Sequence, residues 1–306
     1  MKRILLPIII VALVALVGVT NFLVLEDLTD ISTKTVPLAV GPTTGDDLSD
    51  RPLVRIGVVS RFAPNVIYAG YQPIMDYLNH EGTRHYELQL STSYQDAVDR
   101  LRQGQVDASF LGAWIFGHLE SGEDLLPIAA PLNEQGRSEF HAVLVTRAAS
   151  DLTSISQLEG RKVALPSPQS WSGNWLQTNG LADVGLSVAD LDSIHHFDHH
   201  QTVVWQILRG NFDAGVVKES VAAKFRSEGL RTVAVSQAIP GPPLVGRRGV
   251  DHVVLEEISR LLLVLDPDHP ADRRLLESWT PEFSLGFTAV DRRQYQDAFQ
   301  PERANR

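Results

Sequence analysis

The sequence contains no cysteine among its 306 residues. That absence excludes disulfide bonds, thiolate catalysis, cysteine-ligated metals and bacterial lipid attachment at a cysteine. Positive charge is also scarce, because 27 Lys and Arg stand against 37 Asp and Glu, for a formal net charge of −10. Nucleic-acid phosphates require a basic surface, so a nucleic-acid partner is excluded. Any anion that binds must be held by local groups, since the overall field repels it.

A long uncharged run stands at the N-terminus. Lys2 and Arg3 precede a run without charged residues from Ile4 to Leu25. As a helix this run would reach about 33 Å, enough to cross the apolar core of a bilayer. A cleaved secretory signal has a shorter apolar stretch that ends in small residues of the A-x-A type, and no A-x-A stands near the end of this run. We therefore predict that the leader, residues 1–25, is a membrane anchor, with a cleaved signal as the alternative.

This leader predicts export. The basic end stays in the cytoplasm and the bulk of the chain is translocated, which predicts a periplasmic or extracytoplasmic protein tethered to the inner membrane by residues 4–25. Residues 26–52 are rich in Asp, Thr, Pro and Gly with little periodicity, a composition typical of a flexible tether.

From residue 53 onward, segments typical of strands and of helices alternate. The pattern predicts strands at 54–59, 86–90, 106–111, 140–145, 162–166, 212–217 and 231–235, and helices at 67–78, 94–101, 200–208 and 255–265. This alternation favours an α/β protein with open, mostly parallel sheets and helices on both faces. The two halves are built alike, which predicts lobe 1 from residues 53–145 and 245–300 and lobe 2 from residues 146–244. Ligands of such folds bind at the carboxyl ends of strands.

The segment Ser170-Trp171-Ser172-Gly173 lies between a predicted strand and a predicted helix. Two hydroxyls and the free amides of a helix start form a cradle for a small oxyanion, and the helix dipole adds about half a positive charge there. Serine is also the commonest helix cap, so the segment alone fits either role. His200 begins the next predicted helix and could supply a further donor.

Several stretches of the exported part recur together in one known family. They are Tyr94-Gln95-Asp96-Ala97-Val98, Phe110-Leu111-Gly112, Pro168 to Gly173, His200 with Asp213-Ala214-Gly215, Ser236 to Pro240, and Gly286-Phe287 with Tyr295. In this order and spacing, the segment 53–300 resembles the phosphonate, phosphite and phosphate periplasmic binding proteins that serve ABC importers.

The resemblance implies a two-lobed type II binding-protein fold that closes on its ligand. It implies a solute-binding protein with no enzymatic activity, no cofactor and no metal, whose partners are a small oxyanion and an ABC permease. By motif position, the ligand would be contacted by Tyr94, Ser170, Trp171, Ser172, Gly173 and His200.

Departures from the family pattern restrict the ligand. Trp171 stands where the family loop has Thr, which leaves open that the oxyanion is not a phosphorus one. Relatives that bind aminoalkylphosphonates hold the ammonium with carboxylates, and those positions fall on Ser220 and Pro242. Because a closed cleft without a counter-charge disfavours an ammonium, we predict a ligand without an amine: phosphite, phosphate or a small alkylphosphonate.

The sequence leaves three alternatives. The anchor favours, as a second function, a tethered sensing subunit that reports an oxyanion to a sensor kinase. The run from His195 to His200 contains metal-ligand types, but neighbours on a strand point to opposite faces, so only a subset could converge. A serine hydrolase using Ser170 or Ser172 with His200 would lack both the G-x-S-x-G turn and an orienting acid.

Overall fold

The computed structural model describes residues 48–120 and 124–299, which all belong to one compact unit. The predicted anchor at residues 4–25 lies outside these ranges, as does most of the predicted tether. None of the helices in the described part is both long and apolar enough to cross a bilayer.

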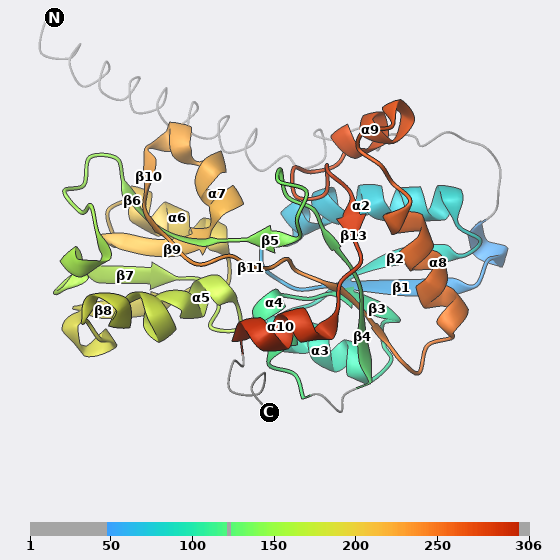
Figure 1. Cartoon of the computed structure of the whole chain (residues 1–306), viewed down its shortest axis with the longest axis horizontal. Coiled ribbons are helices and arrows are strands. Elements are labelled where there is room, and N and C mark those ends of the chain that lie inside the picture. The colour runs from blue at the N-terminus through green and yellow to red at the C-terminus, as the bar shows by residue number, and fades with distance from the viewer. Residues whose placement is uncertain (1–47, 121–123, 300–306) are drawn as a thin grey trace, which may run out of the picture. The chain divides into compact units, whose positions relative to one another are not determined.

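The first lobe is built on a six-stranded sheet with the order β13-β4-β12-β3-β1-β2 (Figure 1). Its strands are β1 (Leu53–Val58), β2 (His85–Leu90), β3 (Ala108–Phe110), β4 (Leu125–Pro131), β12 (Leu244–Arg247) and β13 (Phe287–Thr288). Its helices are α2 (Pro64–Glu81), α3 (Tyr94–Arg102), α4 (Ala113–Gly117), α8 (His252–Leu263), α9 (Pro270–Glu277) and α10 (Arg292–Phe299). In Figure 1, α2 lies on one side of this sheet and α3 on the other.

The second lobe is built on a five-stranded sheet with the order β10-β6-β9-β7-β8. Its strands are β6 (Ala142–Arg147), β7 (Lys162–Leu165), β8 (Ser193–His196), β9 (Ala214–Lys218) and β10 (Leu230–Val235). Its helices are α5 (Trp171–Trp175), α6 (His200–Leu208) and α7 (Glu219–Lys224), and α5 leads into a π-helical turn, η3 (Leu176–Gly180). Figure 1 shows α6 and α7 on one face of the sheet and α5 on the other.

Both sheets are mostly parallel, as the sequence predicts, and each also contains antiparallel strands. In the first sheet β12 runs antiparallel to β3 and β4, and in the second β6 runs antiparallel to β9 and β10. These are the strands by which the chain arrives from the other lobe, so no helical crossover sets their direction. The other strands of the second sheet, and β1 to β4 of the first, run in one direction, so the prediction of mostly parallel sheets is confirmed. The resulting strand order repeats in both lobes, as in the predicted type II binding-protein fold.

The chain crosses between the lobes through β5 (Glu139–Phe140) and β11 (Ile239–Pro240), which pair antiparallel. Just beyond this pair, the Ser236 hydroxyl accepts a hydrogen bond from the Ala142 amide at 3.0 Å and donates one to the Gln237 carbonyl at 2.7 Å. The predicted boundary at residue 145 differs from this crossover, because β6 already pairs within the second sheet from Ala142 onward. The apolar run continues across the crossover, so the sequence pattern does not mark it.

Apolar side chains fill both lobes and hold the strand ends in place. In the first lobe the Tyr71 ring packs edge-on against Phe110 and Phe283, with ring centroids 5.0 Å apart in each pair. In the second lobe Val203 and Ile207 of α6 are fully buried over the sheet. Burial on this scale is the main source of stability in a domain of this size.

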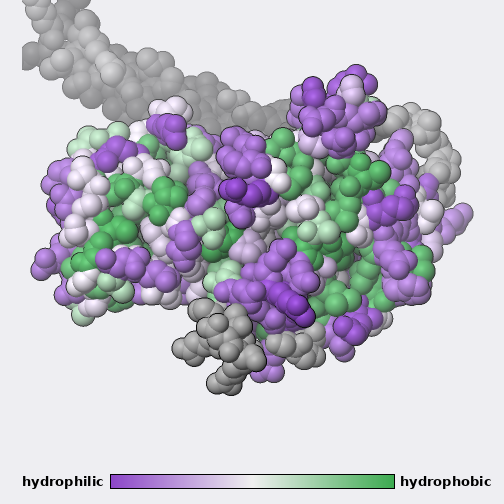
Figure 2. All heavy atoms as spheres, viewed as in Figure 1, coloured by the Kyte–Doolittle hydropathy of each residue, from purple (hydrophilic) through white to green (hydrophobic). Residues whose placement is uncertain are grey.

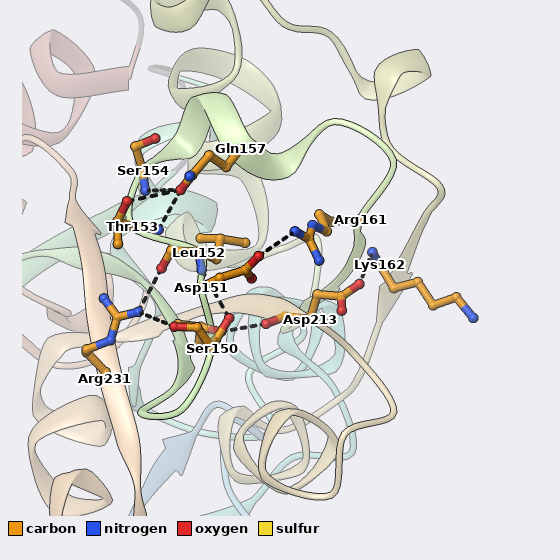
Figure 3. A network of polar contacts seen from close by, with 11 residues as sticks. Ser150, Asp151, Leu152, Thr153, Ser154, Gln157, Arg161, Lys162, Asp213 and Arg231 are labelled. Atoms are coloured by element: carbon orange, nitrogen blue, oxygen red, sulfur yellow. Dashed lines mark hydrogen bonds and ion pairs between the residues drawn. The ribbon is translucent and has the colours of Figure 1, made fainter.

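A polar network closes the amino ends of β7 and β9 (Figure 3). Asp213 accepts a hydrogen bond from the Lys162 amide at 2.8 Å. Arg231 donates to the carbonyls of Ser150 and Leu152 at 3.2 and 2.8 Å, which secures the loop that follows β6. These bonds satisfy backbone groups of the fold itself, so this end of the sheet has a structural role.

Helix α10 couples the C-terminal part of lobe 1 to the crossover. Tyr295 is 0% exposed, packs edge-on against Phe116 at 5.0 Å between ring centroids, and donates its hydroxyl to the Gly241 carbonyl at 2.9 Å. The outer side of the same helix is predominantly polar, as Figure 2 shows. This single residue therefore joins α10 to the segment that follows β11.

Replacing Tyr295 by Phe should lower the free energy of unfolding by about 1–2 kcal/mol, because the buried Gly241 carbonyl loses its donor. Urea unfolding measures the loss. Tyr68→Phe is the matched control, since Tyr68 is 50% exposed, and it should change stability by less than about 0.5 kcal/mol. Equal losses in the two variants would contradict the role given to the Tyr295 hydroxyl.

Candidate functional site

Three of the predicted site residues stand where a strand ends and a helix begins. Tyr94 is the first residue of α3, which follows β2, and His200 is the first residue of α6, which follows β8. Ser170 caps α5, which follows β7. The carboxyl ends of strands are where open α/β sheets bind ligands, so all three occupy the expected edge.

The two serines of the loop differ in the structure. The Ser170 hydroxyl accepts a hydrogen bond from the Gly173 amide at 3.1 Å and donates to the Ser167 carbonyl at 2.8 Å, which makes it a helix cap. The Ser172 side chain is 2% exposed, and its hydroxyl makes no hydrogen bond to any residue of the described part. The hydroxyl of Ser172 is therefore free to donate to a ligand, whereas the hydroxyl of Ser170 already donates within the protein.

Gly173 is required by a close approach of two backbone segments. A Cβ placed on this residue would overlap the carbonyl group of Ser167 and press on the carbonyl oxygen of Pro166. The loop from the end of β7 folds back against the first turn of α5 at this point. Only glycine permits that geometry, which brings the amides of Trp171 and Ser172 to the helix start, where they have no intrahelical acceptor.

The Trp171 indole packs into the apolar core between the lobes. It is 3% exposed, and its ring lies 5.4 Å from Trp114 and 5.6 Å from Phe299 between centroids. Its ring N–H donates to the Ser236 hydroxyl at 3.2 Å, beside the crossover. The indole donor is therefore used within the protein, which leaves the backbone amide of Trp171 as the group for the predicted ligand contact.

Polar side chains from the two lobes meet at this edge. The side chain of Tyr94, from lobe 1, contacts that of Ser170, from lobe 2. Next to them, the Gln169 side-chain amide donates to the Gln95 side chain at 3.4 Å. Burial raises the pKa of Tyr94 to about 12, so its hydroxyl stays protonated and able to donate at neutral pH.

His200 is a neutral donor in this environment. The Lys218 backbone N–H donates to the His200 Nδ1 at 3.3 Å, which places the ring proton on Nε2. Burial lowers the pKa of His200 to about 3, and the charges of Arg61 and Lys218 act in the same direction. The described residues provide no hydrogen-bond partner for Nε2. The Nε2–H group of His200 is therefore a neutral donor on lobe 2 that is available to a ligand.

Three charged residues outside the predicted site stand beside His200. Glu282 accepts from the Arg61 guanidinium at 2.6 Å and from the Lys218 ammonium at 2.8 Å. Arg61 also donates to the Tyr71 hydroxyl. Arg61 and Glu282 belong to lobe 1 and Lys218 to lobe 2, so the Lys218–Glu282 ion pair joins the lobes. We call Arg61, Lys218 and Glu282 the interlobe ion cluster.

By formal charge, the three residues of this interlobe ion cluster sum to one excess positive charge, and the Glu219 carboxylate also acts on Lys218. Burial by itself raises the pKa of Glu282, but Arg61 and Lys218 outweigh it and lower that pKa to about 2. Burial lowers the pKa of Lys218, and the adjacent Glu282 carboxylate opposes that effect. The sequence motifs predict an anion held by uncharged donors, whereas the structure adds two cations and one carboxylate at the same edge.

The sequence could have indicated two of the three residues of the interlobe ion cluster. Arg61 follows β1 and Lys218 ends β9, so both stand at carboxyl ends of strands, where a ligand is expected. Glu282 lies in the segment between α9 and β13 and has no such signal. It is 221 residues from Arg61 and 64 from Lys218 along the chain.

Two of the histidines that precede His200, His195 and His196, have other partners. The His196 Nδ1 donates to the Pro166 carbonyl at 2.7 Å, and its Nε2 contacts the Gln177 side-chain amide at 3.2 Å. The His195 ring packs on Phe197 at 4.6 Å between centroids. No group of three or more metal-ligating side chains converges within the described residues.

The fold and this site define a two-lobed solute-binding protein. The sequence profile of the family described as "ABC transporter, phosphonate, periplasmic substrate-binding protein" matches residues 56–295. Because this match covers well over half of the chain, the protein belongs to that family.

Individual relatives are distant in sequence. The phosphate-import protein PhnD of Mycolicibacterium smegmatis is 23% identical over 211 residues, which make up 63% of this chain and 65% of the relative. A binding protein component of an ABC phosphonate transporter from Pseudomonas aeruginosa has a TM-score of 0.70 at 15% identity, covering 83% of this chain and 85% of that one. PhnD1 of Prochlorococcus marinus in complex with methylphosphonate has a TM-score of 0.68 at 16% identity, covering 83% and 98%. Because these identities are below 25%, the solved structures support the fold alone.

The buried His200 should make stability depend on pH. The unfolded chain takes up a proton near pH 6.5, whereas the folded chain does so only near pH 3, so stability falls as the pH drops through that interval. Between pH 7 and pH 5 the wild type should lose about 2 kcal/mol more than His200→Gln. Urea unfolding at the two pH values measures this difference.

His252→Gln is the control for that comparison, since the His252 side chain is 81% exposed. It should keep the wild-type difference between pH 7 and pH 5. A His200→Gln variant with the same pH dependence as the wild type would show that folding does not lower the pKa of His200.

Replacing Gly173 by Ala should lower stability by about 1–3 kcal/mol, because the loop must move away from the Ser167 carbonyl. Gly70→Ala is the matched control, because its added Cβ would lie at an ordinary 3.5 Å from the Thr280 Cγ2. This helical substitution should leave stability unchanged or raise it by up to about 1 kcal/mol. Thermal unfolding distinguishes the two, and an unaffected Gly173→Ala variant would refute the close approach.

Proposed function

We propose that this protein is an exported solute-binding protein that captures a small oxyanion between its lobes and delivers it to an ABC permease. The proposed ligand is phosphite, phosphate or a small alkylphosphonate without an amine. Membership of the phosphonate-binding family supports the class of function. The names of two relatives support the ligand class, since one is called a phosphate-import protein and another is seen with methylphosphonate.

The observation that carries the proposal is the neutral His200 donor at the lobe boundary, beside a net positive ion cluster. The chain as a whole has a formal charge of −10, so an anion gains little from the overall field. A buried anion is instead stabilised by directed donors and by nearby cations, whose positions select its shape and charge.

Each predicted contact has a stated role in this proposal. His200 donates through Nε2, Ser172 and Tyr94 donate through hydroxyls, and Trp171 donates through its backbone amide. Ser170 and Gly173 shape the loop that presents these donors. Because the donors come from both lobes, binding would favour the closed arrangement over an open one.

A hydrolytic role receives no support from the geometry. The Ser170 hydroxyl donates to the Ser167 carbonyl, and the His200 Nδ1 accepts from the Lys218 amide. No serine of the described residues forms a hydrogen bond with the His200 ring. The nucleophile–base pair that a serine hydrolase requires is therefore not assembled.

The proposal also gives the protein a cellular location and a partner protein. Residues 4–25 would anchor the protein in the inner membrane with the lobes outside the cytoplasm. The closed, loaded lobes would then meet the permease at the membrane surface.

A thermal-shift screen tests the proposal with phosphite, phosphate, methylphosphonate, 2-aminoethylphosphonate, sulfate and zinc chloride. A ligand at about 100 times its dissociation constant stabilises the folded state by about 2.7 kcal/mol. For a chain of this size, that should raise the melting temperature by about 5–10 °C. Stabilisation by sulfate alone would show that the ligand is not a phosphorus oxyanion. Stabilisation by zinc alone would refute the proposal.

His200→Ala should weaken the best ligand by about tenfold or more, because a charged ligand loses a buried donor. Isothermal titration calorimetry measures the change. His195→Ala is the matched control from the same run of histidines, since its side chain is exposed. An unchanged affinity in His200→Ala would remove this residue from the proposed site.

A further inference from the structure

The Lys218 ammonium is enclosed like a bound organic cation. Its Nζ lies 2.8 Å from the Glu282 carboxylate and 4.9 Å from the centroid of the Phe140 ring, and its side chain is 13% exposed. The three residues come from different parts of the fold: β9 of lobe 2, a loop of lobe 1 and the crossover strand β5. A carboxylate together with an aromatic face is the environment that proteins use to recognise an ammonium group.

This enclosed ammonium stands next to the proposed oxyanion donor. The backbone N–H of Lys218 donates to the His200 ring at 3.3 Å. Arg61 shares the Glu282 carboxylate with Lys218. An aminoalkyl group attached to an oxyanion on His200 would therefore meet Arg61 and Lys218, whose shared Glu282 carboxylate is already paired.

We propose that Lys218 takes the place of a ligand ammonium and is the residue that excludes aminoalkyl oxyanions from this site. The inference rests on the proposed function and deepens it, because it assigns the exclusion of amines to one side chain. Like charges brought together in a buried site disfavour the wrong ligand strongly. The excess positive charge of the interlobe ion cluster selects instead for an oxyanion with a neutral or acidic substituent.

Removing the lysine should therefore change the selectivity in one direction. Lys218→Ala deletes the ammonium and its aliphatic stem, and leaves the Glu282 carboxylate and the Phe140 ring facing the freed space. A ligand ammonium can then occupy that space and pair with Glu282. Lys218→Met removes the charge but keeps most of the volume, so it should admit an aminoalkyl ligand less well than alanine does.

The test is calorimetric titration of the full chain, held in detergent micelles, with methylphosphonate and 2-aminoethylphosphonate. The wild type should prefer methylphosphonate by about tenfold or more. In Lys218→Ala the ratio of the two affinities should shift toward 2-aminoethylphosphonate by at least about tenfold. The double variant Lys218→Ala with Glu282→Gln should lose this gain, because the carboxylate that would pair with the ligand ammonium is gone.

Lys224→Ala is the matched control, since this lysine of α7 is exposed and lies outside the site. It should leave both affinities unchanged. A Lys218→Ala variant that binds both ligands with the wild-type ratio would overturn the inference, as would a wild type that binds 2-aminoethylphosphonate as tightly as methylphosphonate. Lys218→Met, which keeps most of the side-chain volume, provides the same test if Lys218→Ala does not fold: an unchanged ratio of the two affinities in this variant would also overturn the inference. A wild type that binds no phosphorus oxyanion would instead refute the proposed function.

Discussion

The arrangement of the lobes depends on the ion pairs of Glu282 with Arg61 and Lys218. Two cations and one carboxylate are withdrawn from water here, and buried charges are tolerated only when they are paired and hydrogen-bonded. Arg61 pairs with Glu282 within lobe 1, whereas Lys218 comes from the opposite lobe, so the Lys218 ammonium is paired only when the lobes meet. Electrostatics and lobe closure are therefore one constraint in this protein.

The same charges determine what His200 can do. An imidazole that is buried beside two cations stays neutral, and the Lys218 amide bound to its Nδ1 directs the remaining proton outward from Nε2. The site thus combines a fixed neutral donor with an excess of one positive charge. This combination suits a small anion in a protein whose total charge is strongly negative, because short-range donors act where the overall field does not help.

Much of the fold could be predicted from local sequence patterns. The predicted helices at 94–101 and 200–208 agree with α3 and α6 to within one residue. The antiparallel strands β6 and β12 could not be predicted, because strand direction follows from how the chain passes between lobes. Helices α9 and α10 were also missed, since they are short and polar apart from single buried residues such as Leu276 and Tyr295.

The sequence by itself determined the features that depend on neighbours along the chain. Ser170 caps a helix through a hydrogen bond to an amide three residues away, and Gly173 permits a backbone approach within the same loop. Interactions between residues a few positions apart can be predicted from the local sequence. The tertiary structure alone decided that Trp171 packs its indole on Trp114, and that Glu282 pairs with Arg61 and Lys218. The physical reason is that packing and charge pairing depend on distance in space, which the order of residues does not specify.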